Sequence, residues 1–202
     1  RLQDGRTLAA PAVILAAGGA SYPGTGSTGD GYGLAAAAGH SLVQIRPALV
    51  PLETHGKRAA RLQGLSLKNV SAALWIEGKK QSQAFGEMLF THFELSGPII
   101  LTLSRMVVEA LDQSLRPTIS IDLKPALDHA RLDARLQRDL ASHGRMQAAN
   151  LLKGLLPAKL IPLCLEETGI PPTPPPPRMS SPLRKKLRKW LKDLPFPVTG
   201  PR

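Results

Sequence analysis

The residues best suited to chemistry lie in one glycine-rich segment near the start of this 202-residue chain. Residues 13–17 are an apolar run without polar alternation, which predicts a strand covered on both faces of a parallel sheet. Gly18 and Gly19 follow, and glycines let the backbone turn and let a ligand approach without meeting a Cβ atom. A small-residue helix is predicted at 34–38, and main-chain N–H groups at a helix start bind oxygen-rich groups. This order of elements suits a dinucleotide or a flavin.

The glycine spacing by itself leaves an alternative open. Gly24, Gly26 and Gly29 match the pattern G-x-G-x-x-G. They do not follow the strand directly, however, as the pyrophosphate-binding fingerprint requires. An ordinary glycine-rich surface loop is the alternative interpretation. Asp30 is predicted to cap the helix that continues through Gly31, and not to act as a catalytic acid.

His92 is the candidate for acid–base chemistry. It lies between a predicted strand and a predicted helix cap at Ser96, and an imidazole can donate a proton near neutral pH. The alternative is a structural hydrogen bond to the neighbouring loop. Cys164 is the only cysteine, which excludes an internal disulfide and a cysteine-based metal site. No metal-ligand pattern is evident, and no metal is assigned.

Three motifs occur in a specific order along the chain. They are the glycine segment, Pro-Ala-Leu-Val-Pro-Leu over 47–52, and Gly-Glu-Met-Leu-Phe-Thr-His-Phe-Glu-Leu-Ser-Gly-Pro over 86–98. With these motifs the chain resembles the bacterial NAD(P)/FAD-dependent oxidoreductases of the aminoacetone-oxidase or BaiN-like type. The resemblance implies an FAD cofactor, with NAD(P)H as reductant, and places His92 near substrate or flavin as a proton donor. The residues that would lie along the flavin are Ala17, Gly18, Gly19, Pro23, Thr25, Gly26, Gly29 and Gly31.

The chain also departs from that family. Its members begin with a strand and a G-x-G-x-x-G loop for the FAD pyrophosphate, and they end with a glycine-rich segment over the flavin. Neither is evident here, so the sequence is expected to be an internal piece of a longer flavoenzyme that binds FAD weakly or not at all by itself. Glu94 stands where the family usually has a small residue.

The elements that position these residues suggest three parts. Residues 1–50 are expected to be a fragment of an α/β, Rossmann-like FAD-binding domain, in which a single parallel strand lacks its neighbours. Residues 51–125 are expected to be the β-rich part of an inserted α+β domain. Its antiparallel strands are predicted at 70–76, 81–90 and 118–123, with a turn at 77–80 and a helix that Ser96 caps and Pro98 begins.

Residues 126–202 are expected to be the helical part of the insert. A helix is predicted at 127–142, and a second apolar helical run at 151–165 is interrupted by Pro157 and Pro162. An extended proline-rich linker is predicted at 171–177, and a basic amphipathic helix at 183–194. Residues 178–202 hold eight Lys or Arg against the single acid Asp193, which is +7 of the chain's net charge of +11. The helix could bind nucleic acid or an anionic surface, but a helix that packs its leucines inward and solvates its charges is the simpler interpretation.

The sequence therefore predicts a fragment of a cytoplasmic FAD-dependent oxidoreductase that acts on an unidentified small organic substrate. The alternative is a non-catalytic basic module that binds nucleic acid or an anionic surface through its last helix. Nucleic acid is not expected as a partner, because aromatic residues are only 4% of the chain and no nucleic-acid motif is present. No apolar run is long enough to span a membrane. The substrate, the choice between NADH and NADPH and the oligomeric state stay open.

Overall fold

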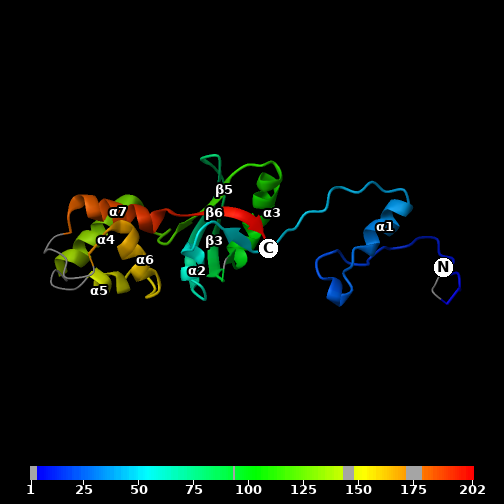
Figure 1. The fold of residues 1–202 in the computed structure, drawn as a ribbon, viewed down its shortest axis with the longest axis horizontal. Coiled ribbons are helices and arrows are strands. Elements are labelled where there is room, and N and C mark those ends of the chain that lie inside the picture. Colours follow the sequence, from blue (N-terminus) through cyan, green and yellow to red (C-terminus); the bar gives the residue numbers. More distant parts are fainter. Residues whose placement is uncertain (1–3, 93, 143–147, 172–178) are drawn as a thin grey trace. The chain divides into compact units, whose positions relative to one another are not determined.

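The computed structural model describes residues 4–92, 94–142, 148–171 and 179–202. The chain divides into two compact units, Arg1–Pro47 and Ala48–Arg202. Figure 1 shows the elements of both units, which are described separately below.

A closed barrel of six antiparallel strands is the centre of the second unit. The strand order is β1-β4-β3-β2-β5-β6, so every strand has two neighbours and no edge is left open. Inward side chains such as Leu74, Ile119 and Ile121 are fully buried. The strands are β1 (Leu52–Thr54), β2 (Ser66–Ile76), β3 (Lys79–Phe90), β4 (Glu94–Ser96), β5 (Pro117–Asp122) and β6 (Leu194–Pro201). Antiparallel strands with a helical part are therefore present as expected.

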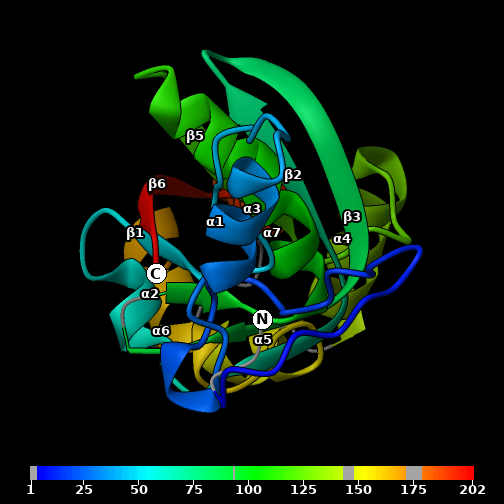
Figure 2. The same cartoon turned by 90° about the vertical axis from the view of Figure 1, so that its right-hand side faces the viewer.

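The β2–β3 hairpin is the longest pairing in the barrel, and it curves along one side of it (Figure 2). The predicted strands and turn are confirmed here, with a tighter turn than expected. Glu77 and Gly78 connect the strands with φ angles of 48° and 75°. Two consecutive residues with positive φ match the right-handed twist of the flanking strands.

Helix α3 (Pro98–Asp112) packs its buried face against β2, β3 and β6. The predicted first turn at Pro98 is confirmed, but the predicted cap is wrong. Ser96 ends β4, and the N-cap is Gly97, with φ 91° and ψ 168°. A Cβ atom at Gly97 would lie 2.8 Å from the Cα atom of Met88. Only glycine fits this close approach and this backbone conformation.

Strand β6 differs from the expectation that residues 126–202 are helical. It pairs with β5 through Thr118 and Pro197 and with β1 through Leu52 and Pro201, and so closes the barrel. Phe196 of β6 is buried against Phe90 of β3, with ring centroids 5.5 Å apart. The last residues of the chain therefore belong to the same core as the first strand of the unit.

Four helices gather on one side of the barrel: α4 (His129–Ser142), α5 (Ala148–Lys153), α6 (Leu160–Thr168) and α7 (Ser181–Lys192) (Figure 1). The predicted interruption of the run 151–165 is confirmed at Pro157, which falls between α5 and α6, but it does not occur at Pro162. Pro162 lies in the first turn of α6, where a missing N–H breaks no helical bond. Of the predicted proline-rich linker, residues 172–177 lie outside the described residues.

The first unit contains the short 3-10 helix η1 (Pro23–Thr25) and helix α1 (Asp30–Ala37). The predicted strand at 13–17 is not formed, and no strand occurs within residues 4–47. Val13 and Ile14 are 85% and 92% exposed. The expected Rossmann-like sheet is therefore not shown, because a parallel strand needs partner strands for its main-chain groups.

Candidate functional site

The glycine segment, residues 17–31, folds back on itself. Gly18, Gly26 and Gly29 have φ angles of 76°, 93° and 87°, which lie in the left-handed region that favours glycine. The main-chain N–H of Gly29 donates a hydrogen bond of 3.1 Å to the carbonyl oxygen of Gly19. This bond joins the two ends of the loop around η1.

Small residues let the two sides of this loop approach each other. A Cβ atom at Gly31 would lie 3.3 Å from the Cβ atom of Ala17. A Cβ atom at Gly19 would lie 3.3 Å from the hydroxyl oxygen of Tyr32. Both distances are shorter than ordinary van der Waals contacts, so the glycines serve the packing of the loop itself.

The N-terminus of α1 has no side-chain cap, because its N-cap is Gly29. The prediction that Asp30 caps the helix is wrong, since Asp30 is its first residue and its carboxylate accepts no capping bond. No side chain caps the first main-chain N–H groups of α1, and the N–H of Tyr32 donates to the Gly29 carbonyl oxygen at 3.0 Å. The acidic Asp30 beside them disfavours a phosphate, and neutral carbonyl or hydroxyl oxygens, which a flavin ring and its ribityl chain carry, fit better.

All eight residues predicted to lie along the flavin are in this one segment of the first unit. Gly19, Gly29 and Gly31 are half-buried, and the other five are exposed. A Cβ atom at Gly26 would meet nothing within 4 Å, so the backbone there is open to a ligand, and this fits the neutral part of FAD.

His92 lies in the second unit, in the exposed bend between β3 and β4. Close to it in sequence, Glu94 is buried, 8% exposed, and accepts a hydrogen bond of 3.1 Å from the Thr91 hydroxyl. An ion pair of 2.9 Å also joins Glu94 to Arg202. Glu94 thus ties β4 to the residue that follows β6.

A junction pocket of about 400 Å³ lies between the barrel and the helices. Arg58 lines this pocket, and its guanidinium donates to Glu167 of α6 at 2.8 Å and lies 5.6 Å from the ring centre of Phe196. The indole N–H of Trp190 donates to the same carboxylate at 2.7 Å. Sequence reasoning missed this pocket, and its only local signal is the run His55-Gly-Lys-Arg58 after β1. Because Arg58 and Glu167 satisfy each other, the network holds the helices on the barrel.

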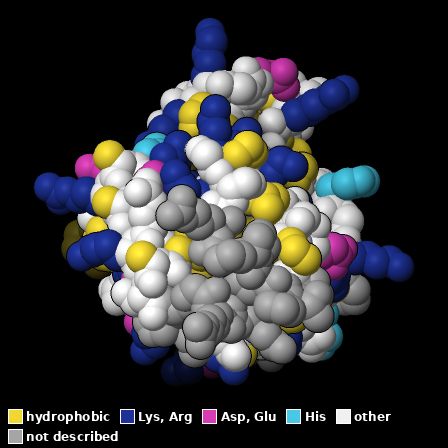
Figure 3. Space-filling model, turned by 90° about the vertical axis from the view of Figure 1, so that its left-hand side faces the viewer, with side chains coloured by type: hydrophobic (Ala, Val, Ile, Leu, Met, Phe, Trp, Pro, Cys, Tyr) yellow, Lys and Arg dark blue, Asp and Glu magenta, His cyan; other side chains and the backbone are white. Residues whose placement is uncertain are grey.

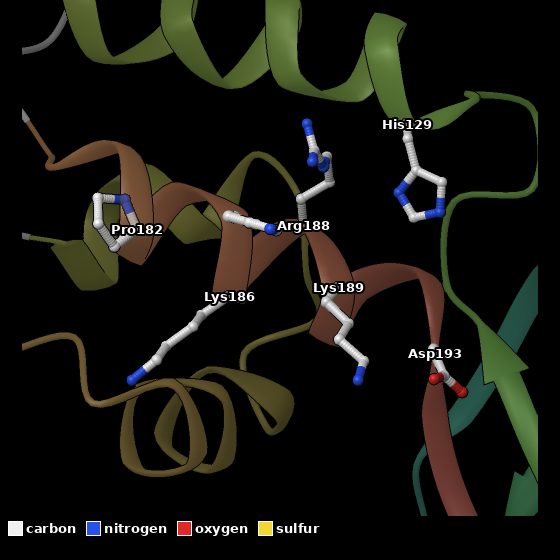
Figure 4. A pocket seen from close by; sticks show the side chains of 7 residues that line it. His129, Pro182, Lys186, Arg188, Lys189 and Asp193 are labelled. Atoms are coloured by element: carbon white, nitrogen blue, oxygen red, sulfur yellow. The ribbon is translucent and has the colours of Figure 1, made fainter.

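A second hollow, the basic hollow, has a volume of about 670 Å³ and follows α7 (Figure 4). Helix α7 is the basic amphipathic helix that the sequence predicts, although Leu194 belongs to β6. The lining of the hollow combines four cations and a proline of α7 with the first residue of α4 and the residue between α7 and β6. These residues are His129, Pro182, Lys185, Lys186, Arg188, Lys189 and Asp193.

The described residues also bear on three other classes of site: a metal site, a membrane span and a reactive thiol. They contain no group of three or more His, Cys, Asp or Glu placed to hold a metal ion. Within the same ranges, every helix is too short or too polar to cross a bilayer. Cys164 is fully buried in α6, and burial raises the pKa of its thiol to about 12. A nucleophilic thiolate is therefore excluded at neutral pH.

Comparison with known proteins gives a family match that covers the whole of the second unit. Residues 46–202 match the family model described as "HI0933-like protein barrel and H2TH domain". The chain is 31% identical, over 83% of its length, to the 3-dehydro-bile acid delta(4,6)-reductase of Clostridium scindens. It is 32% and 30% identical, over 77% and 78% of its length, to the ribosomal RNA dihydrouridine synthases of Haemophilus influenzae and Escherichia coli. It spans 41%, 36% and 37% of these three relatives.

Proposed function

The chain belongs to the HI0933-like family, the flavoprotein family that its motifs resemble, and from this premise we propose that it works in an FAD-dependent oxidoreductase that reduces a carbon–carbon double bond. The proposal is carried by the activities that the relatives' names state, which have one reaction type in common. A delta(4,6)-reductase and a dihydrouridine synthase both add two hydrogens across a double bond. A purely non-catalytic module is not favoured, since these relatives are enzymes.

The glycine segment is the part of this chain that would hold FAD. Main-chain N–H groups at the start of α1 would bind neutral oxygens of the cofactor, and Gly18, Gly26 and Gly29 would let it approach the backbone. Bound FAD supplies hydride transfer. NAD(P)H is the proposed reductant, and the cytoplasm the proposed compartment.

His92 is the proposed proton donor. Reduction of a double bond adds a hydride to one carbon and a proton to the other, so a proton must be delivered to the substrate. His92 is exposed in the β3–β4 bend, within the motif shared with the family. Two substrate classes follow from the relatives: a small unsaturated ketone, as in a bile-acid intermediate, and a uridine within RNA.

The test uses the protein at its full natural length. We expect it to purify with a flavin absorbance spectrum that NADH or NADPH bleaches without oxygen, and that an unsaturated substrate restores. Replacing Gly29 by Ala forces a side chain into the left-handed region, which costs about 1–2 kcal/mol. It should weaken FAD binding by about 5- to 30-fold, as measured by titration of flavin fluorescence.

The matched control is Gly24→Ala, because a Cβ atom at Gly24 meets nothing within 4 Å and its φ is not positive. This variant should bind FAD like the unchanged protein. His92→Gln should keep the flavin spectrum but slow the rate at which an unsaturated substrate restores the bleached flavin absorbance. A full-length protein that takes up no flavin would refute the proposal, and an unchanged rate in His92→Gln would remove His92 from it.

A further inference from the structure

Helix α7 carries two rows of cations with different surroundings. The inner row faces acids of neighbouring elements. Arg184 and Arg188 lie 2.9 Å and 3.4 Å from the carboxylate of Asp133 on α4, and Lys192 lies 2.5 Å from Asp122 at the end of β5. These three cations hold α7 in place, and two carboxylates, Asp133 and Asp122, compensate two of their three charges.

The outer row consists of Lys185, Lys186 and Lys189, all exposed. Among the described residues, none of the three has a hydrogen-bond or ion-pair partner. Asp193, the acid in the lining of the basic hollow, accepts a hydrogen bond of 2.5 Å from the Ser120 hydroxyl. Figure 4 shows Lys186 and Lys189 extending away from α4, whereas Arg188 extends toward it. Three uncompensated ammonium groups therefore line one open hollow.

The outer row is contiguous along the helix. Lys185 and Lys189 are four residues apart, about 6 Å along the axis, and Lys186 lies beside them. Figure 3 looks onto this end of the unit and shows Lys and Arg side chains gathered near its upper part. Lysines on flexible stems act as point charges that bind phosphate groups without demanding one geometry.

The apolar side of α7 decides whether its anionic partner is a nucleic acid or a membrane surface. Leu187 and Leu191 are fully buried, and Trp190 is 8% exposed. A helix that binds in a membrane interface needs a free apolar face to insert among the lipid chains. In α7 that face is used in the core, so only its charges are available.

We propose that the outer lysine row of α7 is a docking surface for the phosphate backbone of RNA. The inference rests on the proposed function and deepens it, because it selects RNA from the two substrate classes. Backbone contacts of this kind hold a substrate in register without reading its sequence. The base to be reduced would then be recognised elsewhere.

The experiment measures binding of a fluorescein-labelled 20-nucleotide RNA hairpin to the full chain by fluorescence anisotropy, over a range of KCl concentrations. The test variant is Lys185→Gln/Lys186→Gln/Lys189→Gln. Each phosphate contact contributes about 0.7–0.9 to the slope of log K against log salt, so the slope should fall by about 2–3. Affinity at low salt should fall by about tenfold or more.

The matched control is Lys68→Gln/Lys79→Gln/Lys80→Gln, which removes three exposed lysines from the β2–β3 hairpin. It should keep the RNA affinity and the slope. Vesicles of phosphatidylglycerol and phosphatidylcholine should not bind the chain. Unchanged binding in the test variant, equal losses in the control, or binding to vesicles in place of RNA would each overturn the proposal. RNA binding requires no flavin, so failure here is distinct from failure of the proposed redox function.

Discussion

At the scale of single residues, Gly97 has the strictest requirement in the second unit. It combines a positive φ with an extended ψ, a conformation almost confined to glycine, and it approaches Met88 to within contact of the backbone. The motif around residues 86–98 is therefore explained in part by packing. Gly97 lets β4 turn into α3 directly above β3.

Replacing Gly97 by Ala is expected to destabilise the second unit by about 3 kcal/mol, because backbone strain and a clash with immobile main-chain atoms add together. The measurement is the urea midpoint followed by tryptophan fluorescence, with an unchanged m-value. Gly64→Ala is the matched control, since Gly64 has φ 79° but nothing within 4 Å of a built Cβ. It should cost about 1 kcal/mol. Equal losses in the two variants would show that the close approach is unimportant.

At the scale of elements, one carboxylate, that of Asp133 on α4, forms ion pairs with two arginines of α7. The hydrogen bond from Arg184 is the main cause that lowers the pKa of Asp133, and Gln137 and Arg188 contribute in the same direction. The side chain of Asp133 is 20% exposed. Its carboxylate is therefore more shielded from solvent than a carboxylate in an ordinary surface ion pair. It contacts side chains of both α4 and α7.

This contact predicts how stability depends on pH. The pKa of Asp133 is lower in the folded than in the unfolded state, where an Asp has a value of about 3.9. Its contribution is thus complete above the unfolded value and is lost as pH falls through the folded value. Between pH 5 and pH 3 the unchanged chain should lose about 1 kcal/mol more stability than Asp133→Asn, as measured by urea unfolding.

The control for this effect is Glu87→Gln, which removes an exposed carboxylate whose Lys68 partner is 3.6 Å away. Its stability should follow the pH dependence of the unchanged chain closely. If Asp133→Asn and the unchanged chain lost the same stability in acid, the Arg184 contact would not stabilise the helix pair.

At the scale of the whole molecule, the two units differ in how they are stabilised. The hydrophobic core is made of residues between Leu52 and Val198, and Arg58 and Trp190 join the helices to the barrel through Glu167. The first unit has no buried residue in its described helices. Burial of apolar surface is the main stabilising term, so the second unit should hold nearly all of the folding free energy.

Deleting residues 1–47 is therefore expected to change the free energy of unfolding of the remaining chain by less than about 0.5 kcal/mol. The measurement is urea unfolding followed by Trp75 and Trp190 fluorescence. Deleting residues 194–202 instead is the contrasting variant, because it removes β6 and opens the barrel. That deletion should abolish cooperative unfolding. A large loss from the first deletion would show that the glycine segment contributes to the core.

Sequence by itself determined the local elements of this protein and its family. The β2–β3 hairpin, α3, α4 and α7 follow from periodicity and turn residues, because neighbouring residues carry that information. Tertiary structure decided the rest. Pro195 and Pro197 argue against a strand in the sequence, so β6 is not predicted. In the structure both prolines are exposed, and Phe196 between them is buried. Which cations of α7 have an acidic partner depends on Asp122 and Asp133. These acids are distant from α7 in sequence, so only the folded structure shows which cations they pair with.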